Sequence, residues 1–211
     1  MGKVLNRIAV EGPIGAGKTA LAIKIAERIK GEPVLERIED NPFIENFYKE
    51  MRGYAFQTQL FFLFQRHQKE RMIAQGDLFK DKIVTDFFFE RDRVYAYLNL
   101  DENELLLYEK IYNFLKRDII APDLVVYLQT KPEILYKRVQ NSKRPWEREI
   151  SLEYLKALCD AYNRFFFQYN SSALLIVNPE GMDFINNSTH FDALMKEILS
   201  TSSEKRFYSY G

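Results

Sequence analysis

The sequence lacks features that mark several large classes of protein. It has one cysteine, Cys159, which leaves no possibility of an internal disulfide or of a cysteine-rich zinc site. Its 30 basic and 30 acidic residues give a formal net charge of zero, whereas proteins that bind nucleic-acid polymers usually carry a basic excess. We therefore expect Cys159 to be a core thiol in a reducing compartment, and we expect no nucleic-acid polymer as a partner.

The sequence also shows no signal for membrane insertion or targeting. No stretch approaches the ~18–20 consecutive apolar residues of a membrane-spanning helix. The first residues lead directly into a strand-like run and offer no signal peptide. Neither an internal repeat nor a Gly/Ser-rich or Pro-rich linker divides the 211 residues, a length typical of one α/β domain. These absences predict a single cytoplasmic domain, residues 1–211, with no membrane partner.

Apolar material is abundant and regularly arranged. Hydrophobic residues make up 46% of the chain, with 17 Phe and 13 Tyr. Short, continuously apolar runs, typical of strands buried on both faces, occur at residues 7–11, 33–36, 82–86, 124–128 and 174–177. Segments of helical length separate or follow them, at residues 18–30, 56–75, 102–116, 131–140 and 151–169. This alternation predicts an α/β fold in which a five-stranded parallel sheet has helices on both faces.

Three acidic residues stand at or near the ends of expected strands, namely Glu11, Glu36 and Asp86. In open parallel sheets, ligands bind beyond the carboxyl ends of the strands. Because those ends lie along one edge of the sheet, the three carboxylates should face the same crevice. The sequence therefore places the functional site at that edge.

A phosphate-binding loop follows the first expected strand. It fits the pattern Gly, four residues, Gly, Lys, Thr with the residues Gly12, Pro13, Ile14, Gly15, Ala16, Gly17, Lys18 and Thr19. The glycines allow successive backbone amides to point into one concavity, where phosphate oxygens also meet the positive end of the following helix. Lys18 supplies a charge for the β- and γ-phosphates and Thr19 a hydroxyl ligand for Mg²⁺. The loop predicts binding of ATP or GTP with Mg²⁺.

Two carboxylates and one amide are candidates for the chemistry of the acceptor. Asp86 ends an expected strand, where a carboxylate can support Mg²⁺; the alternative is that Asp86 caps the next helix. Glu36 could accept the proton of an acceptor hydroxyl, although a surface carboxylate is the simpler interpretation of Glu36 alone. Gln57 lies in an aromatic helix that we otherwise expect to be core, and an amide can pair with two edge groups of a nucleobase.

Five cations gather within twelve residues of this neutral chain, namely Lys137, Arg138, Lys143, Arg144 and Arg148. Residues 141–150 are polar and include a proline, which predicts an exposed loop between two helices. Arginines on such a loop can close over a transferring phosphoryl group and neutralise its charge. We therefore predict a basic lid loop at residues 141–150, with a solvated charged surface as the alternative.

These motifs, in their order and spacing, resemble the deoxyribonucleoside kinase family, especially its bacterial deoxyadenosine and deoxyguanosine kinases. The resemblance runs from Ile8 to about Phe191 and is carried by residues 11–19, 36–43, 47–48, 56–57, 143–147 and 183–184. It implies a P-loop kinase fold and ATP-dependent phosphorylation of a deoxyribonucleoside at its 5′-hydroxyl. It also implies ATP and Mg²⁺ as cofactors and a homodimer as the assembly.

The resemblance also implies a role for each matching residue. The implied contacts to the nucleoside are Glu36 as the catalytic base, Tyr48 and Glu147 at the sugar 3′-hydroxyl, and Phe56 and Gln57 at the base. The implied contacts to phosphate are Arg138 and Arg144, and the implied contacts to the ATP adenine are Asp183 and Phe184. Asp86 is left to serve Mg²⁺ or the 5′-hydroxyl.

The chain departs from the family pattern where the base is recognised. Phe87 follows Asp86 at a position where the family often has Arg. Asp92 or Arg93 lies where other members place a base-contacting Asp-Arg pair, so base recognition could be rearranged. The lid has Lys143 before Arg144 where Arg-Gly-Arg is common. These departures leave the preferred base open.

Other functions stay open at this stage. A nucleoside monophosphate kinase, such as a thymidylate kinase, shares the loop and a basic lid, but it would need more cations around the acceptor than the acidic and aromatic segments after Glu36 and Asp86 provide. A non-catalytic nucleotide-binding regulatory protein is a second alternative. A switch-type GTPase would need an Asn-Lys-x-Asp motif, which residues 141–143 do not supply. For the tail, residues 201–211, the sequence predicts no structure.

Overall fold

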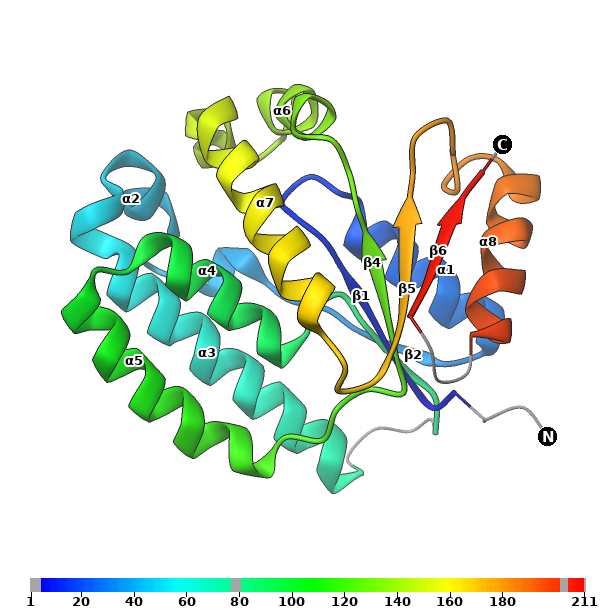
Figure 1. The fold of residues 1–211 in the computed structure, drawn as a ribbon, viewed down its shortest axis with the longest axis horizontal. Helices are drawn as coiled ribbons and strands as arrows, with labels where there is room; N and C mark the ends of the chain where they lie inside the picture. The colour runs from blue at the N-terminus through cyan, green and yellow to red at the C-terminus, as the bar shows by residue number, and fades with distance from the viewer. Residues whose placement is uncertain (1–4, 77–80, 202–204, 211) are drawn as a thin grey trace.

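The molecule is organised around one parallel sheet. The structure, a computed structural model, describes residues 5–76, 81–201 and 205–210. The strands that these residues form are β1 (Arg7–Glu11), β2 (Glu32–Val34), β3 (Ile83–Thr85), β4 (Leu124–Leu128), β5 (Ala173–Asn178) and β6 (Lys205–Ser209). They lie in the order β2-β3-β1-β4-β5-β6, with every neighbouring pair parallel (Figure 1). The predicted α/β fold is confirmed, but with six strands rather than five.

The sixth strand corrects the expectation for the tail. The sequence predicts no structure for residues 201–211, yet β6 forms there and pairs with β5 from Lys205 opposite Leu174 to Ser209 opposite Asn178. Most side chains of β6 are exposed, because it lies at the edge of the sheet. Backbone pairing holds this strand, and Tyr208 is its one side chain that packs against the core, so the continuous apolar run that reveals the inner strands is missing from it.

The α-helices of the described residues are α1 (Lys18–Ile29), α2 (Ile44–Lys49), α3 (Met51–Gln75), α4 (Asp92–Asn99), α5 (Glu102–Leu115), α6 (Pro132–Gln140), α7 (Leu152–Gln168) and α8 (Ser188–Ser200). The five helices expected from the sequence are all present, and α3 extends further toward the N-terminus than expected. Three helices were not expected, namely α2, α4 and α8. Among the described residues, no helix has both the length and the apolar character that crossing a membrane requires.

Alternate side chains of each strand pack against opposite layers of helices. Ile8 and Val10 of β1 belong to the core formed with α1 and α8, whereas Ala9 lies in the core formed with α4 and α7. Figure 1 shows α3, α4, α5 and α7 on one side of the sheet and α1 and α8 on the other. The strands are therefore covered on both faces, which explains their continuous hydrophobicity.

The carboxyl ends of the inner strands form the edge at which the candidate site lies. The phosphate-binding loop leaves β1 there and leads into α1. Residues 141–150, between α6 and α7, contain a short turn of 3-10 helix at Pro145–Glu149, and this turn contacts α2. The expected lid thus lies across from α2 at the same edge of the sheet (Figure 1).

Candidate active site

The loop at residues 12–17 has the backbone geometry that a bound phosphate requires. A Cβ atom on Gly12 would lie 2.9 Å from the carbonyl oxygen of Leu128, so only glycine fits where the loop passes β4. Gly17 has a φ of 95° and precedes α1, and no side chain caps that helix. The first backbone N–H groups of α1 therefore have no side-chain partner and fit an anion.

Two cations lie against this loop. Lys18 Nζ donates to the carbonyl oxygens of Gly12 and Pro13 at 2.9 and 3.0 Å. Arg138 of α6 donates to the carbonyl oxygen of Gly15 at 2.9 Å. Burial lowers the pKa of Lys18 to about 8, although nearby carboxylates oppose the shift. Both side chains are thus placed where a polyphosphate needs positive charge.

A cavity of about 360 Å³, which we call the loop cavity, opens beside the loop. Its walls include the predicted residues Ile14, Gly15, Gly17, Lys18, Thr19, Glu36, Asp86, Arg138, Arg144 and Glu147. The fold therefore brings together the loop, the ends of two strands, α6 and the lid, which are far apart in the sequence.

Asp86 connects the start of α1 to the segment that follows β2. Its Oδ2 accepts a hydrogen bond from Thr19 Oγ1 at 2.5 Å, and its Oδ1 accepts one from the backbone N–H of Glu36 at 2.7 Å. Asp86 is 3% exposed and caps no helix, so the alternative role suggested by the sequence is ruled out. A hydroxyl beside a carboxylate is a set of hard oxygen donors, which fits Mg²⁺.

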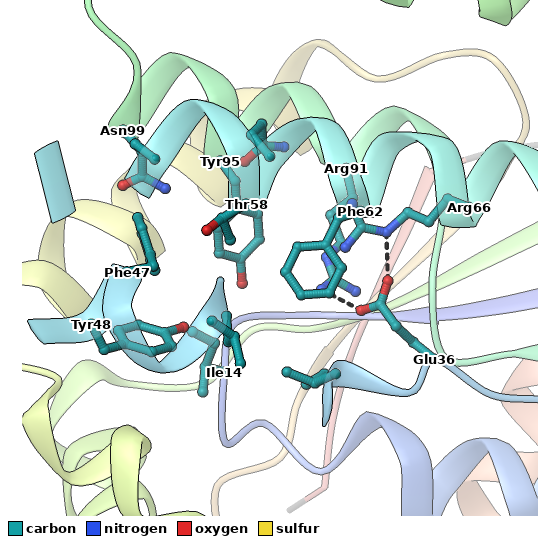
Figure 2. A pocket seen from close by; sticks show the side chains of 14 residues that line it. Ile14, Glu36, Phe47, Tyr48, Thr58, Phe62, Arg66, Arg91, Tyr95 and Asn99 are labelled. Atoms are coloured by element: carbon teal, nitrogen blue, oxygen red, sulfur yellow. Dashed lines mark hydrogen bonds and ion pairs between the residues drawn. The ribbon is translucent and has the colours of Figure 1, made fainter. Parts of the chain in front are cut away.

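Glu36 is held between two arginines (Figure 2). Its Oε1 accepts a hydrogen bond from Arg66 Nε at 2.7 Å, and its Oε2 accepts one from Arg91 Nη2 at 3.0 Å. The Glu36 side chain is only 4% exposed, so the interpretation as a surface carboxylate is wrong. Burial raises the pKa of Glu36, but Arg66, Arg91 and Lys18 together outweigh burial and lower this pKa to about 2. The carboxylate is therefore ionised.

A second and largely apolar pocket, which we call the inner pocket, lies next to Glu36. It is lined by Ile14, Glu36, Ile38, Ile44, Phe47, Tyr48, Ala55, Thr58, Gln59, Phe62, Arg66, Arg91, Tyr95 and Asn99. Aromatic rings and a few polar side chains surround this space in Figure 2. Glu36 and Arg91 line both the inner pocket and the loop cavity. Glu36 therefore stands where the two cavities meet.

The amide in the inner pocket belongs to Gln59, which corrects the prediction of Gln57. Gln57 lies on the exposed side of α3, whereas Gln59 is 5% exposed and lines the pocket. Two residues along an α-helix are rotated by about 200°, so the two side chains point to opposite sides. In the same way Phe56 packs in the cluster with α5, and Phe62 lines the pocket instead.

Asp92 and Arg93 point in different directions. The sequence alone left open which of the two contacts the base. Asp92 is fully buried and accepts hydrogen bonds from Arg66 and from the hydroxyl of Tyr108, the latter at 2.9 Å. Arg93 instead donates to Glu109 of α5 at 2.9 Å, away from the inner pocket. Burial raises the pKa of Asp92, and the neighbouring Arg66 opposes that shift. Neither residue lines the inner pocket, which corrects the prediction of a direct base contact, but Asp92 accepts hydrogen bonds from two residues that do line it, Gln59 and Arg66.

Arg144, in the predicted lid, forms ion pairs with two carboxylates. Arg144 Nε donates to Glu39 at 2.6 Å, and Arg144 Nη1 donates to Glu147 at 3.1 Å. Glu147 is 7% exposed and lines the loop cavity, while Tyr48 of α2 lines the inner pocket. Burial raises the pKa of the Tyr48 hydroxyl, and the nearby Glu147 carboxylate adds to this effect. The two residues expected at the sugar therefore lie close together.

Asp183 and Phe184 lie beyond β5, beside the phosphate-binding loop. Phe184 is 6% exposed, and its ring would lie 3.8 Å from a Cβ atom on Gly17. Lys24 of α1 donates to the carbonyl oxygen of Phe184 at 3.3 Å. Asp183 is exposed and accepts from the backbone N–H of Asn186 at 2.8 Å. Neither Asp183 nor Phe184 is among the residues that line the loop cavity.

Several residues of the site were missed by sequence reasoning, among them Thr58, Arg66 and Arg91. Thr58 Oγ1 is buried in the wall of the inner pocket and has no hydrogen-bond partner within the described ranges. Arg66 follows Gln59 by seven residues, a spacing that places both on one face of a helix and could have revealed them as a pair. Arg91 precedes α4, and only the tertiary fold brings it to Glu36.

Comparisons with known proteins agree with this geometry. A family model described as deoxynucleoside kinase matches residues 8–202. The chain is 29% identical to a deoxyguanosine kinase of Bacillus subtilis over 196 residues, which cover 90% of this chain and 95% of that protein. It is 27% identical to a deoxyadenosine kinase of Lactobacillus acidophilus over 209 residues, covering 92% and 95% respectively.

One solved structure is also similar along nearly its whole length. It is described as a deoxyadenosine kinase from M. mycoides with the products dCMP and a flexible dCDP bound. It matches with a TM-score of 0.79 and 25% identity, covering 92% of this chain and 99% of that chain. The relatives thus share a reaction type while their names specify different bases.

Proposed function

The chain belongs to the deoxynucleoside kinase family, and from that premise we propose that it transfers the γ-phosphate of ATP to the 5′-hydroxyl of a deoxyribonucleoside. The observation that carries this proposal is the position of Glu36 where the inner pocket meets the loop cavity. The loop cavity has the cations for a polyphosphate, and the inner pocket has the apolar walls and few polar groups typical of a site for a small organic molecule. The products named for the M. mycoides relative support the same reaction.

Glu36 accepts or orients the proton of the 5′-hydroxyl. The 5′-oxygen forms a bond to the γ-phosphorus, the bond between that phosphorus and the bridging oxygen breaks, and ADP leaves while the proton passes to the Glu36 carboxylate. Arg91, which lines both cavities, donates a hydrogen bond to Glu36 and so holds its side chain in place. Most of the acceleration comes from positioning and electrostatics, because this reaction leaves little covalent work to the protein.

The donor set fits ATP and Mg²⁺. Thr19 and Asp86 would hold Mg²⁺, which when bound neutralises charge on the phosphates. Lys18, Arg138 and Arg144 would hold the phosphoryl groups, and for this Arg144 exchanges its carboxylate partners for phosphate. Asp183 and Phe184 would contact the adenine of ATP, as the family resemblance implies.

Residues of both cavities would position the nucleoside. Gln59 lines the inner pocket and would receive the base, and the fully buried Asp92 accepts hydrogen bonds from the Gln59 amide. Tyr48 lines the same pocket and Glu147 lines the loop cavity, and both would receive the sugar 3′-hydroxyl. The relatives named above are kinases of different deoxynucleosides, so the preferred base stays open.

A nucleoside monophosphate kinase is the less favoured function. Its acceptor carries a phosphate, which would need free cations in the inner pocket. The cations that line this pocket are Arg66 and Arg91, and both already hold carboxylates. The pocket therefore favours an uncharged acceptor, and the family match points the same way.

The position of phosphorylation is tested with matched substrates. The enzyme is assayed for ADP release with a 2′-deoxynucleoside, with its 2′,5′-dideoxy analogue and with its 2′,3′-dideoxy analogue. We expect no ADP release above background with the 5′-deoxy compound, and reduced but measurable release with the 3′-deoxy compound. Loss of release only with the 3′-deoxy compound would contradict the proposed acceptor.

Gln59 and Gln57 provide a matched pair for base recognition. We expect Gln59→Ala to raise KM for the deoxynucleoside by about tenfold or more, because one good amide–base pair is worth about 1–3 kcal/mol. Gln57→Ala, on the exposed side of the same helix, should leave KM within about twofold of the wild type. Steady-state kinetics with saturating ATP measures both, and equal effects would contradict the assignment.

The lowered pKa of Lys18 predicts a pH dependence of ATP binding. Below pH 8 the lysine is protonated before ATP binds, so pH has little effect through this group. Above pH 8 the lysine is largely neutral and must take up a proton when the phosphates bind, so Kd rises by up to about tenfold per pH unit. Calorimetry at pH 9 in buffers of different ionisation enthalpy should report uptake of nearly one proton. Proton uptake close to zero would contradict the prediction.

Two further expectations rest on the sequence and the family resemblance alone. The protein is a homodimer, which multi-angle light scattering tests as twice the monomer mass. It works in the cytoplasm, where ATP and nucleosides are both present.

A further inference from the structure

The loop between β5 and α8, residues 179–187, lies against the start of α1, and we call it the donor loop. The ring of Phe184 would lie 3.8 Å from a Cβ atom on Gly17, so the donor loop meets the end of the phosphate-binding loop. Lys24 of α1 donates to the carbonyl oxygens of Phe184 and Ile185. One side of the donor loop is therefore attached to the helix that follows the phosphate-binding loop.

His190, in the first turn of α8, holds the donor loop at a second point. The backbone N–H of Asp183 donates to His190 Nδ1 at 3.0 Å. A ring nitrogen that accepts a hydrogen bond carries no proton, so this contact places the proton of the neutral imidazole on Nε2. The Asp183 carboxylate itself accepts from the backbone N–H groups of Ile185 and Asn186 at 3.2 and 2.8 Å. The contact with His190 therefore ties this turn of the donor loop to α8.

The edge strand β6 brings an aromatic ring to the same place. It runs parallel to β5 and ends with Ser209 opposite Asn178, so both strands end at the edge of the sheet where ligands bind. Tyr210 follows directly, and its ring centroid lies 4.3 Å from that of His190, with an angle of 49° between the rings. Figure 1 shows the end of β6 beside the beginning of α8. The tail of the chain thus packs against the residue that holds the donor loop.

The donor loop needs such support because most of its residues are exposed. An exposed segment with few buried contacts opens easily, and ordering it when a ligand binds costs affinity. Contacts that hold the loop beforehand remove part of this cost. His190 and Tyr210 supply such contacts from outside the loop, from α8 and from the end of β6.

We propose that His190 and Tyr210 are positioning residues that hold the donor loop in the conformation that receives the adenine of ATP. Tyr210 packs against the His190 ring, and that ring holds the backbone of Asp183. The proposal rests on the proposed function, in which Asp183 and Phe184 contact the adenine. Its consequence is that the end of the chain contributes to the affinity for the base of ATP and leaves the affinity for its phosphates unchanged.

Two probes separate the base from the phosphates in a binding experiment. MgATP occupies both loops, whereas magnesium tripolyphosphate reaches the phosphate-binding loop alone. We expect His190→Ala to raise Kd for MgATP about fivefold, a change typical of one lost hydrogen bond, and Tyr210→Ala to raise it about threefold through the lost ring contact. Kd for tripolyphosphate should stay within about twofold of the wild type in both variants. Isothermal titration calorimetry at pH 7.5 measures all four constants.

Steady-state kinetics should show the same separation. We expect KM for ATP to rise about three- to fivefold in the two alanine variants. The kcat at saturating ATP and KM for the deoxynucleoside should stay within about twofold of the wild type, because neither residue lines the inner pocket or the loop cavity. A general loss of structural integrity would instead lower kcat and change both KM values.

Conservative variants and a matched control identify the groups responsible. His190→Asn keeps an acceptor near the position of Nδ1, and Tyr210→Phe keeps the ring, so both should bind MgATP within about twofold of the wild type. Phe207→Ala removes an aromatic ring from β6 that is 73% exposed. It should leave Kd for both probes at the wild-type value.

The outcomes distinguish this role from the proposed function. Unchanged MgATP affinity in both alanine variants, or an equal loss for MgATP and tripolyphosphate, would overturn the positioning role while turnover of a deoxynucleoside still establishes the kinase. Should His190→Ala not fold, Tyr210→Ala decides, because it changes an exposed side chain close to the end of the chain. If no nucleoside is turned over, the proposed function fails, and the two binding constants still decide whether these residues support the adenine.

Discussion

Glu36→Gln is expected to lower turnover by about 10²-fold or more while ATP still binds. The amide keeps the size of the carboxylate but cannot accept the proton of the 5′-hydroxyl, and general-base catalysis contributes about 10²–10⁴-fold to rate. ATP binding should persist because the phosphate-binding loop, Lys18 and Arg138 are unchanged. Coupled ADP release measures kcat, and fluorescence with a labelled ATP analogue measures binding.

The controls for Glu36→Gln address folding and charge. Arg66 and Arg91 lose the charge of their shared partner, so we also expect a lower Tm, and retained ATP binding shows that the variant is folded. Glu45→Gln, at an exposed position of α2, should have wild-type turnover. Near-normal turnover in Glu36→Gln would remove Glu36 as the base.

Lys18→Ala is expected to lower kcat/KM for ATP by about 10²–10³-fold. Lys18 is placed at the phosphate-binding loop, and removal of one group that stabilises charge in a transition state typically costs this much. Proton uptake on ATP binding at pH 9 should also disappear, because the neutral Lys18 amine is the group that takes up the proton. Steady-state kinetics with varied MgATP, together with calorimetry, measures both effects.

The matched control for Lys18→Ala is Lys156→Ala, at an exposed position of α7. It removes one positive charge from the protein without touching either cavity, so its kinetics should equal those of the wild type. A loss for Lys18→Ala that is no larger than the loss for Lys156→Ala would contradict the assignment of Lys18 to the phosphates.

The phosphate-binding loop could be predicted from the sequence because its requirements are local. Gly12 must be glycine to pass Leu128, and Gly17 must take a positive φ before α1, so the chemistry is encoded in consecutive residues. The inner strands were predictable for a similar reason, since burial on both faces gives continuous apolar runs. The edge strand β6 has no such run, because most of its side chains are exposed.

The inner pocket was harder to predict because it depends on helix phase and tertiary approach. Aromatic residues surround α3 on several sides, so the sequence did not reveal that Gln59 rather than Gln57 faces inward. Arg66 and Arg91 lie 30 and 55 residues from Glu36 in the sequence, and only the packed fold brings all three together. The family resemblance supplied the role of Glu36, whereas the residue taken alone favoured a surface carboxylate.

The central claim, transfer of phosphate from ATP to a deoxynucleoside, is tested most directly by one substrate panel. ADP release is measured with MgATP and each of deoxyadenosine, deoxyguanosine, deoxycytidine and thymidine, with the four corresponding 5′-monophosphates in parallel. We predict turnover with one or more nucleosides and none above background with the monophosphates. Turnover with the monophosphates alone would contradict the account and assign the inner pocket to a phosphorylated acceptor.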